Sequence, residues 1–277
     1  MHSITPTPSP ALVKHVGNDV VRRVAPYPID TYPELVCEVA ALAYQNKDFL
    51  LFFRGQDRDY LNKAGSSTFY PTIYRKDILT AHEVYSRFDT LETAELQLLD
   101  AFDSAQVEGR QDVRRKSYIA WSILQHYGVC DTPLLDLTLS LQAAASFAQY
   151  KTQEERGVVF VFALPYPNNR VTYNGEHEMV VVNLLSVCPP LAQRPRFQDG
   201  YLAGTLDLTC DYGDKSELDF NNRLVAKFSI HNDASFWVSD LKGIPDHLLF
   251  PPDDPMADLC KEVKTRLINE IKNIFVL

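Results

Sequence analysis

The sequence has 277 residues, of which 45% are hydrophobic and 23% charged, and its formal net charge is −9. This composition is typical of a folded globular chain and excludes an intrinsically disordered one. The acidic balance argues against non-specific binding of duplex nucleic acid, which depends on a basic face.

The five cysteines are scattered, and no two of them form a CxxC pair. Neither a disulfide framework nor a zinc site is therefore predicted, and no metal is expected. No run of residues approaches the roughly 18 apolar positions of a membrane span, and the N-terminal stretch lacks the apolar core of a signal peptide. The cytoplasm is the expected compartment, with no membrane partner.

The composition along the chain predicts a loose arm, rich in Pro, Ser and Thr, over residues 1–28 and a single domain over residues 29–277. A helix is expected to begin after a cap at Asp30 or Thr31. Its apolar positions share one face, and these are Leu35, Val36, Val39 and Leu42.

A buried strand is predicted next, from Phe49 to Phe53, closed by Gly55. Helical patterns follow between about 80 and 127, one of them within "VYSRFDTLETAELQLLDAF" and another within "DVRRKSYIAWSILQHYG". Further strands are predicted in "GVVFVFAL", "MVVVNLL" and "RLVAKFSI". A short helix capped by Asn232 and a last helix from about Met256 to Lys272 complete one mixed α and β domain.

Arg54 stands at the end of the first predicted strand, in "LFFRGQ". It is either a surface charge or a ligand-binding group held by a rigid strand. The planar fork of arginine suits phosphate or carboxylate, and we expect Gly55 to let a ligand approach the backbone.

Polar side chains gather in "QHYGVCDTPLLDLTLS". His126 and its neighbours Gln125 and Tyr127 end a predicted helix, where packing or capping is the commoner role. In the strand that follows, alternation places Asp136, Thr138 and Ser140 on one face, where they can line a cleft. Ser140 is equally suited to cap the next helix.

Five motifs occur in the order found in the FRG domain family, which the chain resembles from about residue 30 to 270. They are "FFRGQ", "YPTIYR", "QHYG…TPLLDLTLSLQAAASFA", "RPRFQDGY" and "LFPPDDPMADL". Their order also resembles, more distantly, that of ADP-ribosyltransferases. That resemblance implies an α+β fold with a split, mostly antiparallel sheet flanked by helices, and NAD as the substrate.

The same resemblance assigns roles to residues. Arg54, His126 and Gln198 become the catalytic candidates. Arg54 would grip the diphosphate or ribose of NAD. The implied NAD-binding residues are Phe53, Gly55, Gln56, Tyr127, Asp136, Thr138 and Ser140.

Gln198 stands where an ADP-ribosyltransferase places a glutamate. Cleavage of the nicotinamide–ribose bond develops positive charge on the sugar, which a carboxylate stabilises and a neutral amide does not. Three interpretations remain open: a slow or specialised transferase, a different carboxylate at Glu178 or Asp136, or a fold that binds without catalysis. Glu178, in "GEHEMVVV", is otherwise typical of a solvated loop.

The sequence therefore favours an NAD-consuming transferase or glycohydrolase that modifies an unknown protein or nucleic-acid acceptor, as a toxin, effector or phage-defence component would. The alternative is a non-catalytic module that binds a nucleotide or a protein. A third interpretation, a metal-dependent nuclease, is suggested by "DLTCDYGDKSELD", but the regular spacing of a metal loop is missing.

Overall fold

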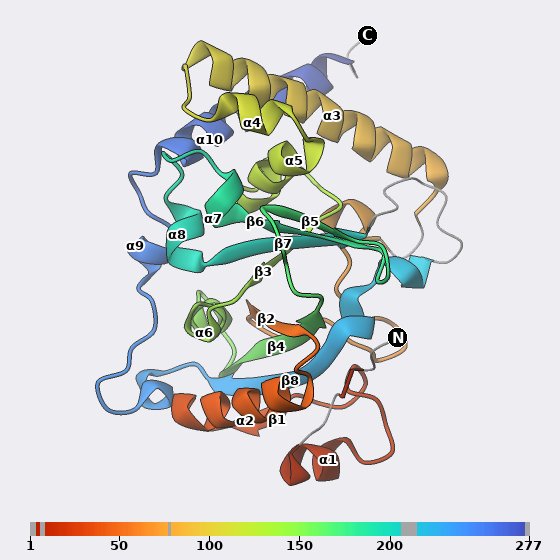
Figure 1. Cartoon of the computed structure of the whole chain (residues 1–277), viewed down its shortest axis with the longest axis vertical. Coiled ribbons are helices and arrows are strands. Elements are labelled where there is room, and N and C mark those ends of the chain that lie inside the picture. Colours follow the sequence, from red (N-terminus) through yellow and green to blue (C-terminus); the bar gives the residue numbers. More distant parts are fainter. Residues whose placement is uncertain (1–3, 6–8, 77–78, 206–214, 275–277) are drawn as a thin grey trace. The chain divides into compact units, whose positions relative to one another are not determined.

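The computed structural model describes residues 4–5, 9–76, 79–205 and 215–274 (Figure 1). Its contacts divide the chain into two compact units, and each unit is assembled from three segments. The first unit comprises Met1–Phe69, Leu137–Tyr166 and Asp219–Phe250. The second comprises Tyr70–Asp136, Pro167–Leu218 and Pro251–Leu277.

The first unit is built on a sheet with the strand order β1-β8-β4-β2-β3. Its strands are β1 (Tyr27–Ile29), β2 (Leu50–Gln56), β4 (Arg156–Leu164) and β8 (Leu224–His231), with the last two residues of β3 (Leu135–Thr138), whose first two residues belong to the second unit. Only the β1–β8 pair is parallel among the pairs described in this unit. The long apolar runs of β4 and β8 explain their central places, because a strand covered on both faces needs no polar alternation.

Helices cover one face of this sheet. The helical segments of the unit are α1 (Pro10–Val16), α2 (Tyr32–Gln45), α6 (Leu141–Gln149), α9 (Asp246–Leu249), η3 (Phe220–Arg223) and η4 (Ala234–Trp237). Leu35 and Leu42 of α2 and Ala144 and Ala148 of α6 pack in one apolar cluster with side chains of β2, β4 and β8. Val36, which the sequence places on the buried face of α2, is 42% exposed.

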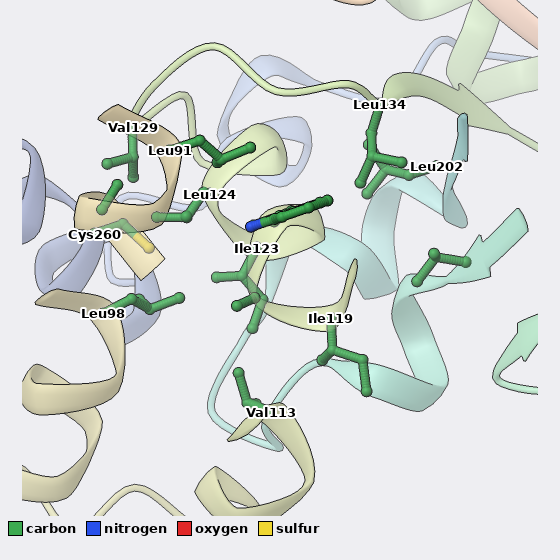
Figure 2. Close-up of a cluster of buried hydrophobic side chains, with 14 of the residues drawn as sticks. Leu91, Leu98, Val113, Ile119, Ile123, Leu124, Val129, Leu134, Leu202 and Cys260 are labelled. Carbon is green, nitrogen blue, oxygen red and sulfur yellow. The ribbon is translucent and has the colours of Figure 1, made fainter. Parts of the chain in front are cut away.

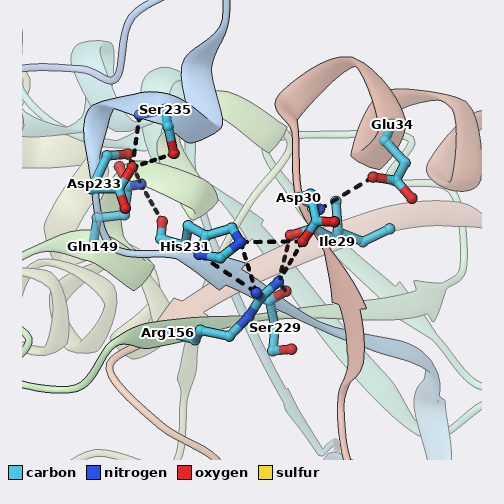
Figure 3. A network of polar contacts seen from close by, with 9 residues as sticks. All are labelled: Ile29, Asp30, Glu34, Gln149, Arg156, Ser229, His231, Asp233 and Ser235. Carbon is cyan, nitrogen blue, oxygen red and sulfur yellow. Dashed lines mark hydrogen bonds and ion pairs between the residues drawn. The ribbon is translucent and has the colours of Figure 1, made fainter.

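Arg156 at the start of β4 fastens the parallel edge of the sheet (Figure 3). Its guanidinium donates to the carbonyl oxygens of Ile29 on β1, at 2.6 Å, and Ser229 on β8, at 2.9 Å. It also lies 2.8 Å from Nε2 of His231, and that nitrogen lies 3.1 Å from the carboxylate of Asp30. The short strand β1 is thus held by side-chain contacts as well as by its ladder.

The second unit combines a three-stranded antiparallel sheet with helices. Its strands are β5 (Val171–Asn174), β6 (Met179–Asn183) and β7 (Gly200–Thr205), in the order β7-β6-β5. Its helical segments are α3 (Ala81–Ser104), α4 (Arg110–Arg114), α5 (Ser117–His126), α7 (Leu184–Val187), α8 (Arg194–Gln198), α10 (Pro255–Ile274), η1 (Thr72–Tyr74) and η2 (Lys215–Leu218). Leu98 of α3, Leu124 of α5 and Cys260 of α10 belong to its core (Figure 2).

The predicted α+β class with a mostly antiparallel sheet is confirmed. Three expected elements are corrected. Strand β2 runs on through Arg54 and Gly55 to Gln56. The helix expected over "DVRRKSYIAWSILQHYG" is two helices, because the backbone of Lys116 is extended between α4 and α5. The helix expected to be capped by Asn232 is a single 3₁₀ turn, η4, capped by Asp233.

The segment predicted to be a loose arm contains helix α1 and most of β1, and Leu12 of α1 is buried. Helix α2 is capped by Thr31, which was one of the two predicted caps, and not by Asp30. Within the described ranges, every helix is too short or too polar to cross a bilayer.

Candidate functional site

Arg54 lies inside strand β2 and not at its tip. Its backbone is opposite Phe160 of β4, and the next two residues, Gly55 and Gln56, are also paired with β4. The side chain of Arg54 is partly buried. Its neighbour Phe53 belongs to the apolar cluster of the first unit and is 6% exposed.

Gly55 faces helix α6 and not open space. A Cβ built on Gly55 would lie 1.8 Å from the carbonyl oxygen of Ala144 and 2.6 Å from the backbone nitrogen of Ala148. The expectation that Gly55 leaves room for a ligand is corrected by this contact, because helix α6 occupies that space. The alanines of α6 have a related role, since their small side chains let its backbone reach the sheet.

Thr138 and Ser140 direct the chain from β3 into helix α6. Ser140 is the N-cap, and its Oγ accepts from the backbone nitrogen of Ala143 at 3.1 Å, as the capping alternative predicts. Oγ1 of Thr138 accepts from the backbone nitrogen of Ser140 at 2.9 Å. Ser140 therefore lies outside the strand, and the expected row of three polar side chains on one strand face is corrected.

A fixed carboxylate stands in the second unit. Asp136 accepts a hydrogen bond from Nε2 of Gln125 at Oδ2, at 2.7 Å, and lies 3.3 Å from Nδ1 of His126 at Oδ1. The side chain of Asp136 is 34% exposed, whereas that of His126 is 5% exposed. Two of the predicted site residues, His126 and Asp136, are thus brought together, with the carboxylate on the solvent side.

The imidazole of His126 is oriented by this pair. An ionised carboxylate only accepts hydrogen bonds, so Nδ1 carries a proton that it donates to Asp136. Nε2 is buried and has no hydrogen-bond partner among the described residues. A Cβ on Gly200 would lie 3.3 Å from Cε1 of His126, so the missing side chain of Gly200 makes room for the ring. This arrangement places Nδ1 of His126 against Oδ1 of Asp136.

The "QDG" motif forms the turn that the sequence predicts. Gln198 ends α8, Asp199 has φ +44°, and Gly200 begins β7. The side chain of Gln198 is 7% exposed, and burial raises the pKa of the Asp199 carboxyl. A Cβ on Gly200 would lie near Leu184 and His126, so this motif ends close to His126 within the second unit.

Tyr127 joins a second polar centre, around the buried carboxylate of Asp254. The Tyr127 hydroxyl donates to Oδ2 of Asp254 at 2.8 Å. The backbone nitrogens of Gln193, Arg194 and Met256 donate to the same carboxylate at 3.1–3.3 Å. Three sequence motifs, around Tyr127, Arg194 and Asp254, therefore meet at one carboxylate.

The burial of this centre changes the pKa of Tyr127. Burial, followed by the nearby charge of Asp254, raises the pKa of Tyr127. The guanidinium of Arg194 lies 4.9 Å from the centre of the Tyr127 ring, which is a cation–π distance. These contacts indicate that Tyr127 has a structural role, in which it holds the Asp254 carboxylate.

Other acidic candidates are less constrained. Glu178 is exposed, in the turn between β5 and β6, with φ +50°. Of the acidic stretch considered for a nuclease, Asp207, Asp211 and Asp214 lie outside the described residues. In the part of the chain that the structure covers, no group of three or more His, Cys, Asp or Glu side chains is placed to hold a metal ion.

Sequence reasoning missed the supports of Asp136. The sequence marks Gln125 only as a helix-end residue, yet its amide contacts the carboxylate directly. Oε1 of Gln125 accepts from the hydroxyls of Thr132, at 2.7 Å, and Thr72, at 3.2 Å. The available signal was the presence of polar residues among apolar neighbours in "YPTIY" and "CDTPLLD".

Comparison with known families finds a match to part of the chain. The family model of the FRG domain matches residues 50–157. The chain contains an FRG domain. The matched residues run from β2 to the start of β4 and include Arg54, His126 and Asp136, whereas Gln198 and Asp254 lie beyond them. No curated protein and no solved structure matches the chain.

Proposed function

We propose that this FRG-domain protein cleaves the nicotinamide–ribose bond of NAD, as a glycohydrolase or an ADP-ribosyltransferase, with Asp136 as the required carboxylate. The observation that supports this is the fixation of the Asp136 carboxylate by Gln125 and His126 while 34% of its side chain stays exposed. A preorganised negative charge stabilises the cation that develops on the ribose. Consumption of NAD would suit a toxin, an effector or a phage-defence protein.

Asp136 is preferred over Gln198 and Glu178, the other two residues that the sequence suggests for stabilising the ribose cation. Gln198 is neutral and largely buried. Glu178 is exposed at a turn, and none of the described residues hydrogen-bonds its carboxylate. A carboxylate that must reorganise at the moment of reaction contributes less than one already held in place.

The test compares two substitutions of equal chemical size. Purified wild-type protein, Asp136→Asn and Glu178→Gln are incubated with NAD, and released nicotinamide is quantified by chromatography. We expect Asp136→Asn to lower kcat by about 100-fold or more and Glu178→Gln to leave it near wild type. Equal rates for wild type and Asp136→Asn would exclude Asp136 from this role.

A non-catalytic binding module is the second candidate. It is favoured by the first unit, where Gly55 accommodates helix α6 and the hydroxyls of Thr138 and Ser140 accept bonds that start this helix. Titration calorimetry with NAD and ADP-ribose separates the candidates. The module predicts saturable binding that Arg54→Ala weakens, with no nicotinamide released by the wild-type protein.

A further inference from the structure

The side chain of Gln125 is held at both ends of its amide. Its Oε1 accepts from Oγ1 of Thr132 at 2.7 Å and from Oγ1 of Thr72 at 3.2 Å, and its Nε2 donates to Asp136 at 2.7 Å. All four residues belong to the second unit. Thr132 is fully buried, so this chain of contacts is sheltered from water on one side.

The direction of these bonds follows from the backbone. Oγ1 of Thr132 accepts from the backbone nitrogen of Leu134 at 3.3 Å, which leaves its own proton for Oε1 of Gln125. Oγ1 of Thr72 accepts from the backbone nitrogen of Thr132 at 2.9 Å, and its own proton has two acceptors within reach, Oε1 of Gln125 at 3.2 Å and the carbonyl oxygen of Thr132 at 3.3 Å. A carboxylate only accepts hydrogen bonds, so the amino group of Gln125 faces Asp136 and its Oε1 faces the two hydroxyls.

We propose that Gln125 is a positioning residue that keeps Asp136 ionised and oriented for bond cleavage, and that Thr72 and Thr132 prevent its amide from turning over. This inference rests on the proposed function, in which Asp136 is the reacting carboxylate. The physical reason is that a donor aimed at a carboxylate favours the charged form, whereas an acceptor in the same place would favour the protonated form. If the amide turned over, its oxygen would face Asp136.

His126 complements this role at the other carboxylate oxygen. Its Nδ1 lies 3.3 Å from Oδ1 of Asp136, and its buried Nε2 has no hydrogen-bond partner among the described residues. The two side chains therefore place one nitrogen against each oxygen of Asp136.

The first test measures Asp136 directly and requires no turnover. The Asp136 carboxyl carbon is followed by carbon-detected NMR over a pH titration, with Asp136→Asn used to assign its signal. Gln125→Glu keeps an oxygen for Thr72 and Thr132 and replaces the donor by a second acceptor, and Gln125→Leu removes both polar ends. We expect the Asp136 titration midpoint to rise in both variants, and more in Gln125→Glu.

The matched control is Gln97→Glu. Gln97 on α3 is half-buried and also donates its amide to a carboxylate, that of Glu270, at 2.5 Å, but it makes no described contact with Asp136. This variant should leave the Asp136 midpoint at its wild-type value. An unchanged midpoint in both Gln125 variants would overturn the proposal.

The second test is the pH dependence of nicotinamide release. In Gln125→Glu, kcat should fall on the acid side by about tenfold for each pH unit below the shifted midpoint and recover as the pH rises. A loss of rate that is equal at every pH would assign Gln125 a merely structural role and overturn the proposal. A shifted midpoint in a protein that releases no nicotinamide would support the positioning role and reject the NAD-cleaving function.

Discussion

Gly55 on strand β2 and Ala144 on helix α6 are so close that a Cβ on Gly55 would lie 1.8 Å from the Ala144 carbonyl oxygen. Gly157 on the neighbouring strand β4 repeats the relationship, because its Cβ would lie 2.1 Å from the carbonyl oxygen of Ala148. The Phe53-Arg54-Gly55 stretch thus contains a glycine whose place is set by helix packing. Its importance to the fold does not depend on a ligand.

The substitution Gly55→Ala should destabilise the protein. Its methyl group meets backbone atoms, which move only if helix α6 moves, so we expect a loss of about 1–3 kcal/mol or more in the free energy of unfolding. Urea denaturation followed by circular dichroism measures it. Gly175→Ala is the control, because a Cβ there meets nothing within 4 Å; equal stability of the two variants would contradict the packing role.

The strand-and-helix pattern of the first unit was predictable where burial dominates. The apolar runs of β4 and β8 are predicted from sequence alone, whereas the caps at Thr31 and Ser140 are each one of two alternatives that the sequence leaves open. The end of β2 was misplaced because a glycine in a strand pattern is commonly a terminator. Here its partner strand β4 continues the ladder to Gln56 and helix α6 needs the missing side chain.

Asp254 is a buried anchor whose charge should matter for stability. Asp254→Asn keeps the shape of the side chain but replaces one accepting oxygen by an amino group that faces donors from Tyr127 or the backbone. We expect a loss of about 3 kcal/mol in the free energy of unfolding. Asp253→Asn is the control, because its side chain is exposed one residue away. A loss below 1 kcal/mol in Asp254→Asn would show that this anchor is weak.

Lys227 and Asp59 form a buried ion pair in the first unit. Nζ of Lys227 donates to Asp59 at 2.5 Å and to Ser67 at 2.7 Å, and the lysine side chain is only 1% exposed. Lys227→Met leaves the carboxylate buried without its partner, so we expect a loss of about 3–5 kcal/mol. Thermal and urea unfolding measure the change.

Two further variants make this prediction specific. Adding Asp59→Leu to Lys227→Met removes the buried carboxylate that has lost its lysine, and it should recover part of the stability. Arg266→Met breaks an exposed pair with Glu262 and should cost less than about 1 kcal/mol. If Lys227→Met and Arg266→Met proved equally mild, the buried pair would have no special role.

The candidate site was harder to predict than the fold because its geometry depends on distant residues. Asp136 and His126 were named from local polarity alone. The orientation of Gln125 is set by Thr72, which lies 53 residues away in the chain. The fit of the His126 ring depends on Gly200, which the sequence marks only as a turn residue. Side-chain direction of this kind is fixed by tertiary packing, which no local pattern encodes.

Three thiols in the second unit, that of Cys260 buried and those of Cys130 and Cys188 partly buried, should make the protein sensitive to alkali. Burial raises the pKa of Cys260 and of Cys130 to about 12, and burial also raises the pKa of Cys188. In the unfolded chain a thiol ionises near pH 8.5. A raised folded pKa gives stability that is complete below the unfolded value and is lost as the pH rises toward the folded value. The free energy of unfolding should therefore fall between about pH 8.5 and pH 12.

Cys260→Ala isolates one thiol. Each such group contributes a slope of up to about 1.4 kcal/mol per pH unit in this window, so the variant should lose stability less steeply with pH than wild type. The slope is separate from the constant loss of packing, which lowers stability at every pH. Cys37→Ala is the control, because Cys37 is exposed, and urea denaturation at pH 8, 9 and 10 measures both variants. Parallel curves for Cys260→Ala and wild type would show that Cys260 ionises alike in the folded and unfolded chain.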